Sequence, residues 1–188
     1  MGVAMSVLAA CSGGPVTTTA PPATPDSDQA FVSETISTAA LTTGDAVPLP
    51  ASTVLTVRGL ISTTNDGDSL RLGTDTLDQL GVLGVGMYEP WVKKQLSFQG
   101  IWLADLLRVA GVEESASHVR LIALDDYEVD LTMAEVDEGG IFLATKTESG
   151  APLPIEEGGP TRIVFMDGVK AGENAGQWIW SLKELELS

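Results

Sequence analysis

The chain has 188 residues, with 26 acidic and 10 basic side chains and a formal net charge of −16. An electrostatic field of that sign repels phosphate backbones, which argues against a nucleic acid partner. His118 is the only histidine and Cys11 the only cysteine, so a histidine-based metal site or a Ser-His-Asp triad has little material to be built from.

The first segment of interest surrounds Cys11, which follows the tripeptide Leu-Ala-Ala and a short apolar run over residues 3–8. This is the cleavage context of a bacterial lipoprotein signal, in which the cysteine thiol takes a diacylglycerol. We therefore expect residues 1–10 to be a signal segment and the mature protein to be exported. It would be lipid-anchored at the outer face of the cell membrane or in the periplasm. A chance alanine-rich N-terminus is the alternative, because the ten residues before Cys11 contain no lysine or arginine.

Residues 11–50 are rich in threonine, proline and alanine and contain no basic residue. Such a composition cannot bury enough apolar surface to offset its chain entropy, so we expect a lipidated N-terminus followed by a flexible tether. Residues 51–188 are sufficient for one domain with its own core. No stretch approaches the ~20 apolar residues that a membrane-spanning helix needs.

Apolar runs between turn signals predict a strand-rich domain after this tether. Strands are expected over residues 53–61, 69–72, 81–86, 119–124, 127–131, 141–145, 161–166 and 177–187. Asp125 and Asp126 form the expected tip of a hairpin. In the last of these strands Trp178, Trp180 and Leu182 would share one face.

Two short helices are expected among the strands. The first covers residues 74–80, with Thr74 as its N-cap. The second covers residues 101–110, where four apolar side chains recur at the spacing of one buried helix face, Leu103, Leu106, Leu107 and Ala110. Together the elements predict an α+β fold that is mostly antiparallel β with a few short helices.

Six segments follow one another in a recognisable order. They are FQGIWLADLL at 98–107, VRLIALDDY at 119–127, LA at 143–144, GAPLP at 150–154, GGPTRIV at 158–164 and WIWSLK at 178–183. In this order they resemble the molybdopterin-binding domain of the sulfite oxidase family, over roughly residues 53–187. The resemblance implies a sulfite oxidase-type molybdopterin-binding fold.

The loop before Phe98 departs from that family. Its enzymes bind molybdenum through a cysteine there, and the corresponding loop of this chain, residues 84–91, carries Met87 at the matching position. A neutral thioether is a poor substitute for a thiolate on a high-valent metal. Basic candidates for the cofactor's phosphate are few, namely Lys93, Lys94, Arg162 and Lys170. We therefore expect no molybdenum cofactor, and prefer a function without catalysis.

The chain is more similar to small, exported, cysteine-less members of the superfamily, which resemble periplasmic pterin-binding proteins. Pro90-Trp91, Asp126-Tyr127 and Trp178-Ile179-Trp180 carry this match. The implied function is reversible binding of a small pterin, by a ligand sensor or adaptor for a membrane signalling partner. Two alternatives stay open: a molybdopterin-dependent oxidoreductase with a non-cysteine metal position, and a scaffold that kept the fold without a ligand.

A pterin is a flat heteroaromatic that needs a stacking face, an acceptor for its amino edge and donors for its carbonyl oxygen. Tyr88 or Trp91 could supply the face, and Asp126 the acceptor. The other candidate ligand-binding residues are Met87, Tyr127, Arg162, Asn174, Gln177 and Trp178. Structural roles are the alternative for several of them: Trp91 could plug the core, Asp126 could serve the turn, and Arg162 could pair with a carboxylate.

Overall fold

The structure is a computed structural model that describes residues 1–2 and 34–188. The strands in these residues are β1 (Glu34–Thr35), β2 (Leu55–Gly59), β3 (Ser69–Leu72), β4 (Leu83–Glu89), β5 (Lys94–Trp102), β6 (His118–Ala123), β7 (Glu128–Thr132), β8 (Ile141–Thr147), β9 (Arg162–Phe165) and β10 (Leu182–Leu187). The helices are α1 (Thr74–Asp78), α2 (Leu103–Ala110) and α3 (Met133–Glu138). Three 3-10 turns follow, η1 (Ile155–Glu157), η2 (Lys170–Glu173) and η3 (Ala175–Gln177).

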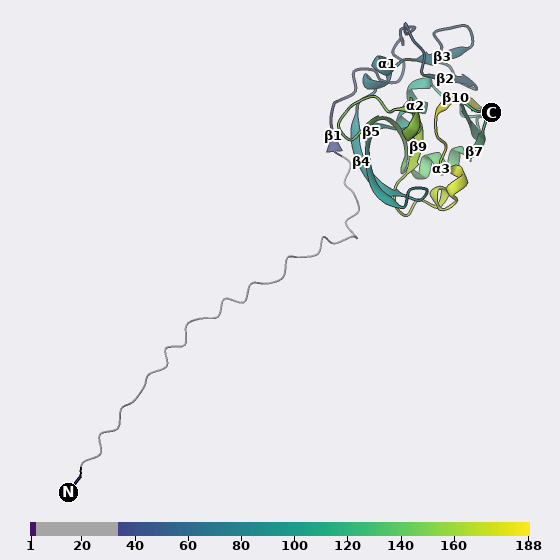
Figure 1. The fold of residues 1–188 in the computed structure, drawn as a ribbon. Helices are drawn as coiled ribbons and strands as arrows, with labels where there is room; N and C mark the ends of the chain where they lie inside the picture. The colour runs from purple at the N-terminus through teal and green to yellow at the C-terminus, as the bar shows by residue number, and fades with distance from the viewer. Residues whose placement is uncertain (3–33) are drawn as a thin grey trace.

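These strands form two five-stranded sheets (Figure 1). The first sheet has the order β1-β4-β5-β8-β9, and the second has the order β3-β2-β10-β6-β7. All strand pairs in the described part of the chain are antiparallel except β10 with β2. The expected strand-rich and mostly antiparallel fold is therefore confirmed, with one mixed sheet that the sequence pattern did not reveal.

Helix α2 contributes its apolar face to a single core that both sheets share. Its predicted buried residues Leu103, Leu106, Leu107 and Ala110 are all buried. The helix contacts β5 and β8 of the first sheet. Gly111 ends it in the left-handed conformation, with φ 65°, which glycine adopts at little cost. Each fully buried leucine of this kind contributes about 1.5–3 kcal/mol through apolar burial.

Several predicted boundaries are wrong. The N-cap of α1 is Gly73 rather than Thr74. Helix α2 begins at Leu103 rather than at residue 101, because β5 stays paired with β8 as far as Trp102. Helix α3 was not expected, although Thr132 and Glu135 form a capping box at its start.

The last predicted strand is also too long. Strand β10 begins at Leu182, and residues 175–177 form a 3-10 turn instead. Trp178 and Trp180 therefore lie in an irregular connection and do not share a strand face.

The expected boundary of the domain at residue 51 lies too far along the chain. Strand β1 pairs with β4, and Val47 is 6% exposed within the shared core. Residues of the 34–50 segment, which the composition assigns to the tether, thus pack with the domain. Residues 3–10 of the predicted signal segment, Cys11 and the tether before residue 34 lie outside the described residues. Within residues 1–2 and 34–188, no helix combines the length and apolarity needed to cross a membrane.

Candidate ligand-binding site

Three connections between strands border an open pocket of about 490 Å³. We call it the aromatic pocket. Its lining comes from the β4–β5 turn, the β6–β7 turn and the connection from β9 to β10, so both sheets contribute to it. The lining residues are Trp91, Ala123, Asp125, Tyr127, Gly176, Trp178 and Trp180.

The polar edges of three aromatic side chains in this pocket are bonded to one segment, residues 172–176. Each side chain donates a hydrogen bond to a backbone carbonyl there, which fixes the ring and leaves its face uncovered by that bond. The bonds run from Trp91 Nε1 to the Ala175 oxygen at 3.2 Å, from Tyr127 Oη to the Gly176 oxygen at 2.8 Å, and from Trp178 Nε1 to the Gly172 oxygen at 2.8 Å. Trp91 remains 59% exposed. Trp91 and Tyr127 thus present anchored and exposed rings to the pocket, whereas Trp178 is mostly buried and packs on Phe165 with ring centroids 5.5 Å apart.

The carboxylate in the wall of the pocket belongs to Asp125. Its Oδ1 accepts the backbone N–H of Tyr127 at 3.2 Å. Asp126 has a left-handed backbone, with φ 65°, and its side chain is 82% exposed and paired with Lys183 at 2.6 Å. Aspartate tolerates this turn conformation better than most residues. The structure therefore gives Asp126 a role in the turn and places Asp125 beside the aromatic faces.

A second cavity of about 730 Å³ adjoins the first, and Trp180 lines both. We call it the acidic groove. It follows β5 and the connection from β8 to β9. Its ionisable lining residues are Lys94, Glu148, Glu156, Glu157 and Arg162. Carboxylates therefore outnumber free cations in its lining.

Arg162 is 1% exposed and occupies the wall between the two cavities. Its guanidinium carbon lies 4.3 Å from the centroid of the Trp180 ring and 5.2 Å from that of Phe98. Nη2 donates to Glu89 Oε1 at 3.0 Å, and Nη1 donates to the Glu157 carbonyl at 3.0 Å. Burial lowers the pKa of Arg162, and the charge of Glu89 opposes that shift. The cation is held by stacking, an ion pair and a carbonyl together.

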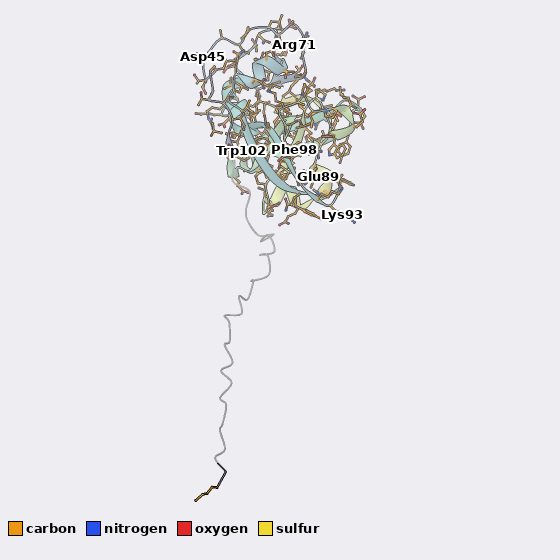
Figure 2. The ribbon with its side chains drawn as sticks, turned by 60° about the vertical axis from the view of Figure 1, so that its left-hand side comes forward. Asp45, Arg71, Glu89, Lys93, Phe98 and Trp102 are labelled. Carbon is orange, nitrogen blue, oxygen red and sulfur yellow. The ribbon has the colours of Figure 1, made fainter. Side chains whose placement is uncertain are left out.

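Glu89 connects this buried arginine to the turn that carries Trp91. Glu89 is 0% exposed, and its second carboxylate oxygen accepts the backbone N–H of Val92 at 2.7 Å. Figure 2 shows Glu89 and Lys93 at the far end of the β4–β5 hairpin, with Phe98 further along and Arg71 at the opposite end of the domain. One carboxylate thus fixes both the arginine and the turn.

Gly158 provides the space in which Trp180 lies. It has φ 86°, a backbone conformation that side chains with a Cβ rarely adopt. A Cβ at this position would lie 3.0 Å from Cγ of Trp180. Its carbonyl also accepts the backbone N–H of Ser181 at 2.7 Å. The glycine therefore allows the connection before β9 to pass close beneath the indole.

The structure gathers some of the sequence-predicted residues and separates others. Trp91, Tyr127 and Trp178 line the aromatic pocket, and Arg162 lines the adjoining groove. Five candidates lie outside both linings: Asp126, described above, and four others, Met87, Tyr88, Asn174 and Gln177.

Local contacts account for three of these four. Met87 is 0% exposed in the core. The Tyr88 backbone N–H donates to Asp167 Oδ1 at 3.1 Å while its side chain is exposed. Asn174 Oδ1 accepts the Gly176 N–H at 3.0 Å, so Asn174 shapes the loop beneath the aromatic pocket.

Three residues of the site were missed from the sequence: Trp180, Glu89 and Asp125. A signal for Glu89 was present, because it stands two residues after Met87 and four after Val85 on a strand. Alternation turns all three inward, and all three are buried. No group of three or more His, Cys, Asp or Glu residues with metal-ligand geometry occurs in the residues that the structure describes.

Comparisons with known proteins agree with this fold. The family model described as "Oxidoreductase molybdopterin binding domain" matches residues 78–186, more than half of the chain. The crystal structure of the sulfane dehydrogenase SoxCD from Paracoccus pantotrophus is similar over 71% of this chain, with 16% sequence identity and a TM-score of 0.54. The chain corresponds to 37% of that SoxCD chain, and at this identity the likeness concerns the fold alone. None of the curated proteins matches at a significant level. The chain belongs to the oxidoreductase molybdopterin-binding domain family.

Proposed function

We propose that this domain binds a small pterin reversibly in the aromatic pocket and acts as a ligand sensor or adaptor without molybdenum catalysis. The observation that carries the proposal is the anchoring of Trp91, Tyr127 and Trp178 by their polar edges. Fixed aromatic faces stack a flat heterocycle with little loss of side-chain entropy, and each good stack contributes about 0.5–1.5 kcal/mol beyond area burial.

Asp125 supports the same ligand. Its carboxylate lies in the wall of the aromatic pocket. A pterin presents an amino group and a ring N–H along one edge, and an ionised carboxylate is the strongest protein acceptor for such a pair. A pterin in this pocket would donate hydrogen bonds from its edge to Asp125 and stack its ring face on the tryptophans.

The residues present do not fit a molybdenum centre held by the protein. Cys11 is the only cysteine of the chain, and Met87, at the position matching the family's cysteine, is fully buried in the core. A buried thioether offers neither the charge nor the access that a high-valent metal requires. The acidic groove is also a poor environment for a phosphate group, because most of its ionisable groups are carboxylates.

A molybdopterin-dependent oxidoreductase is the second candidate. The family match over residues 78–186 favours it, because the family is described by molybdopterin binding and oxidoreductase activity. In that case the cofactor would be held through its pterin rather than through a protein thiolate.

The cellular setting is part of the proposal. The context of Cys11 supports lipidation and export, and the acylated cysteine would hold the domain at the outer face of the cell membrane or in the periplasm. A membrane signalling protein would then be the partner that reads the bound state. Mass spectrometry of the N-terminal peptide from purified protein should find a diacylglycerol on Cys11, and an unmodified Met1-containing peptide would contradict this part.

The proposed ligand is tested on protein purified from its own host. The protein is denatured, the released material is examined for pterin fluorescence, and molybdenum is measured by mass spectrometry. The proposal predicts pterin without stoichiometric molybdenum. Molybdenum at one atom per chain would instead establish the oxidoreductase and contradict the sensor.

A further inference from the structure

The wall between the aromatic pocket and the acidic groove contains an arginine whose charge is already neutralised within the protein. Arginine is the side chain best suited to bind phosphate, because its planar guanidinium donates several hydrogen bonds at once. Here Arg162 lines the acidic groove, but its Nη2 donates to Glu89 at 3.0 Å and its Nη1 to a backbone carbonyl. Its Nε is buried without a partner among the described residues.

Glu89 is not free to leave this arrangement. It is 0% exposed, and its other oxygen accepts the Val92 N–H, so the same carboxylate holds the turn that carries Trp91. Separating Glu89 from Arg162 would leave both charges buried without a counter-ion, which is strongly unfavourable. An incoming phosphate cannot replace Glu89 without paying that cost and releasing the turn.

The remaining charges of the groove act in the same direction. Glu148, Glu156 and Glu157 line it, and Lys94 is the one lining cation in the described residues besides Arg162. A phosphate attached to a ligand in the aromatic pocket would enter this groove past Trp180, which both cavities share. Like charges in close proximity oppose binding and so discriminate between ligands.

We infer that Glu89 is a specificity-determining residue that occupies the anion-binding arginine, so that the site accepts pterins with neutral substituents and rejects those with a phosphate. This inference rests on the proposed function, since it concerns the ligand of the aromatic pocket. Glu89 acts through Arg162 and has no contact with the ligand ring.

The test compares two probes that differ only in one phosphate, 6-hydroxymethylpterin and its phosphate monoester. Their dissociation constants are measured by isothermal titration calorimetry on wild-type protein, on Glu89→Gln and on Glu186→Gln. Glu186 is the matched control, because it pairs with Arg58 at 3.0 Å and lines neither cavity.

We expect wild type to bind the neutral pterin at least roughly tenfold more tightly than the ester, a ratio that corresponds to about 1.4 kcal/mol. Glu89→Gln should reduce that preference several-fold, because a neutral amide leaves the positive charge of Arg162 without a counter-ion and therefore able to attract a phosphate. Glu186→Gln should keep the preference. If Glu186→Gln lost as much of the preference for the neutral pterin as Glu89→Gln does, the inference would be overturned.

The ratio of the two dissociation constants in wild type still tests the inference if Glu89→Gln does not fold. Equal or tighter binding of the ester by wild type overturns the role of Glu89 and leaves the proposed function standing. Failure of wild type to bind either probe overturns the proposed function and this inference together.

Discussion

The aromatic pocket and the acidic groove meet at Trp180, but they differ in how their polar groups are paired. In the pocket, the donors of Trp91, Tyr127 and Trp178 are bonded to the carbonyls of one loop, and the rings of Trp91 and Tyr127 remain exposed. In the groove, one arginine is buried with Glu89 while three other carboxylates line the cavity. This difference supports the proposal that the pocket stacks a flat ring and that the groove excludes negative charge.

The largest expected effect comes from breaking the ion pair in the wall between the two cavities. Glu89→Ala leaves Arg162 charged, buried and without its carboxylate, which should lower the free energy of unfolding by about 3–5 kcal/mol. The partly exposed Glu186 gives the control: Glu186→Ala removes a surface partner of Arg58 and should cost about 1 kcal/mol or less. Urea denaturation of both variants checks this, and similar losses would show that the buried pair has no special structural role.

The next largest effect is on ligand affinity, and two tryptophan variants separate it from an effect on stability. Trp91 is exposed, so Trp91→Ala should weaken pterin binding about tenfold while changing the unfolding free energy little. Trp102 is the control, because it packs edge-to-face on Phe142 with ring centroids 5.2 Å apart and lines neither cavity. Trp102→Ala should lower the melting temperature and preserve affinity. Pterin affinity is measured by calorimetric titration of both variants. An equal loss of affinity in Trp91→Ala and Trp102→Ala would contradict the account.

The smallest expected effect concerns one anchoring hydrogen bond of the pocket. Tyr127→Phe keeps the ring and removes the donor to the Gly176 carbonyl at 2.8 Å. We expect a loss of about 0.5–1.5 kcal/mol in stability and a modest, few-fold loss of pterin affinity from the looser ring. Chemical denaturation and the same binding titration measure the two quantities. A variant that binds pterin more tightly than wild type would mean that the bond does not help to position the ring.

The fold could be predicted well where a local pattern and the tertiary structure agree. The apolar face of α2 and the alternating strands are examples, because burial follows the period of the element. The parallel pairing of β10 with β2 could not be predicted, since these strands are far apart in the sequence. The start of β10 was also misplaced, because the strand-like run of Trp178 to Trp180 lies in the loop that closes the pocket.

Some residues of the candidate site could likewise be predicted from the sequence and others could not. Trp91, Tyr127 and Trp178 could be nominated from their residue types and from the family resemblance, and the structure brings them together. The sequence does not distinguish the two adjacent acids Asp125 and Asp126, and only the turn geometry shows that Asp125 lines the pocket while Asp126 pairs with Lys183. The partner of Arg162 was unspecified, because pairing Glu89 with Arg162 requires β4 and β9 to be placed in one sheet.

The most direct test of pterin binding in the aromatic pocket uses the four tryptophans of the chain as reporters. Their indole N–H signals are assigned in a ¹⁵N–¹H correlation spectrum by single Trp→Phe variants, and 6-hydroxymethylpterin is titrated in. The account predicts that the signals of Trp91, Trp178 and Trp180 shift in a saturable manner while that of Trp102 stays in place. No saturable shift in the three pocket tryptophans, or a shift confined to Trp102, would contradict the proposed site.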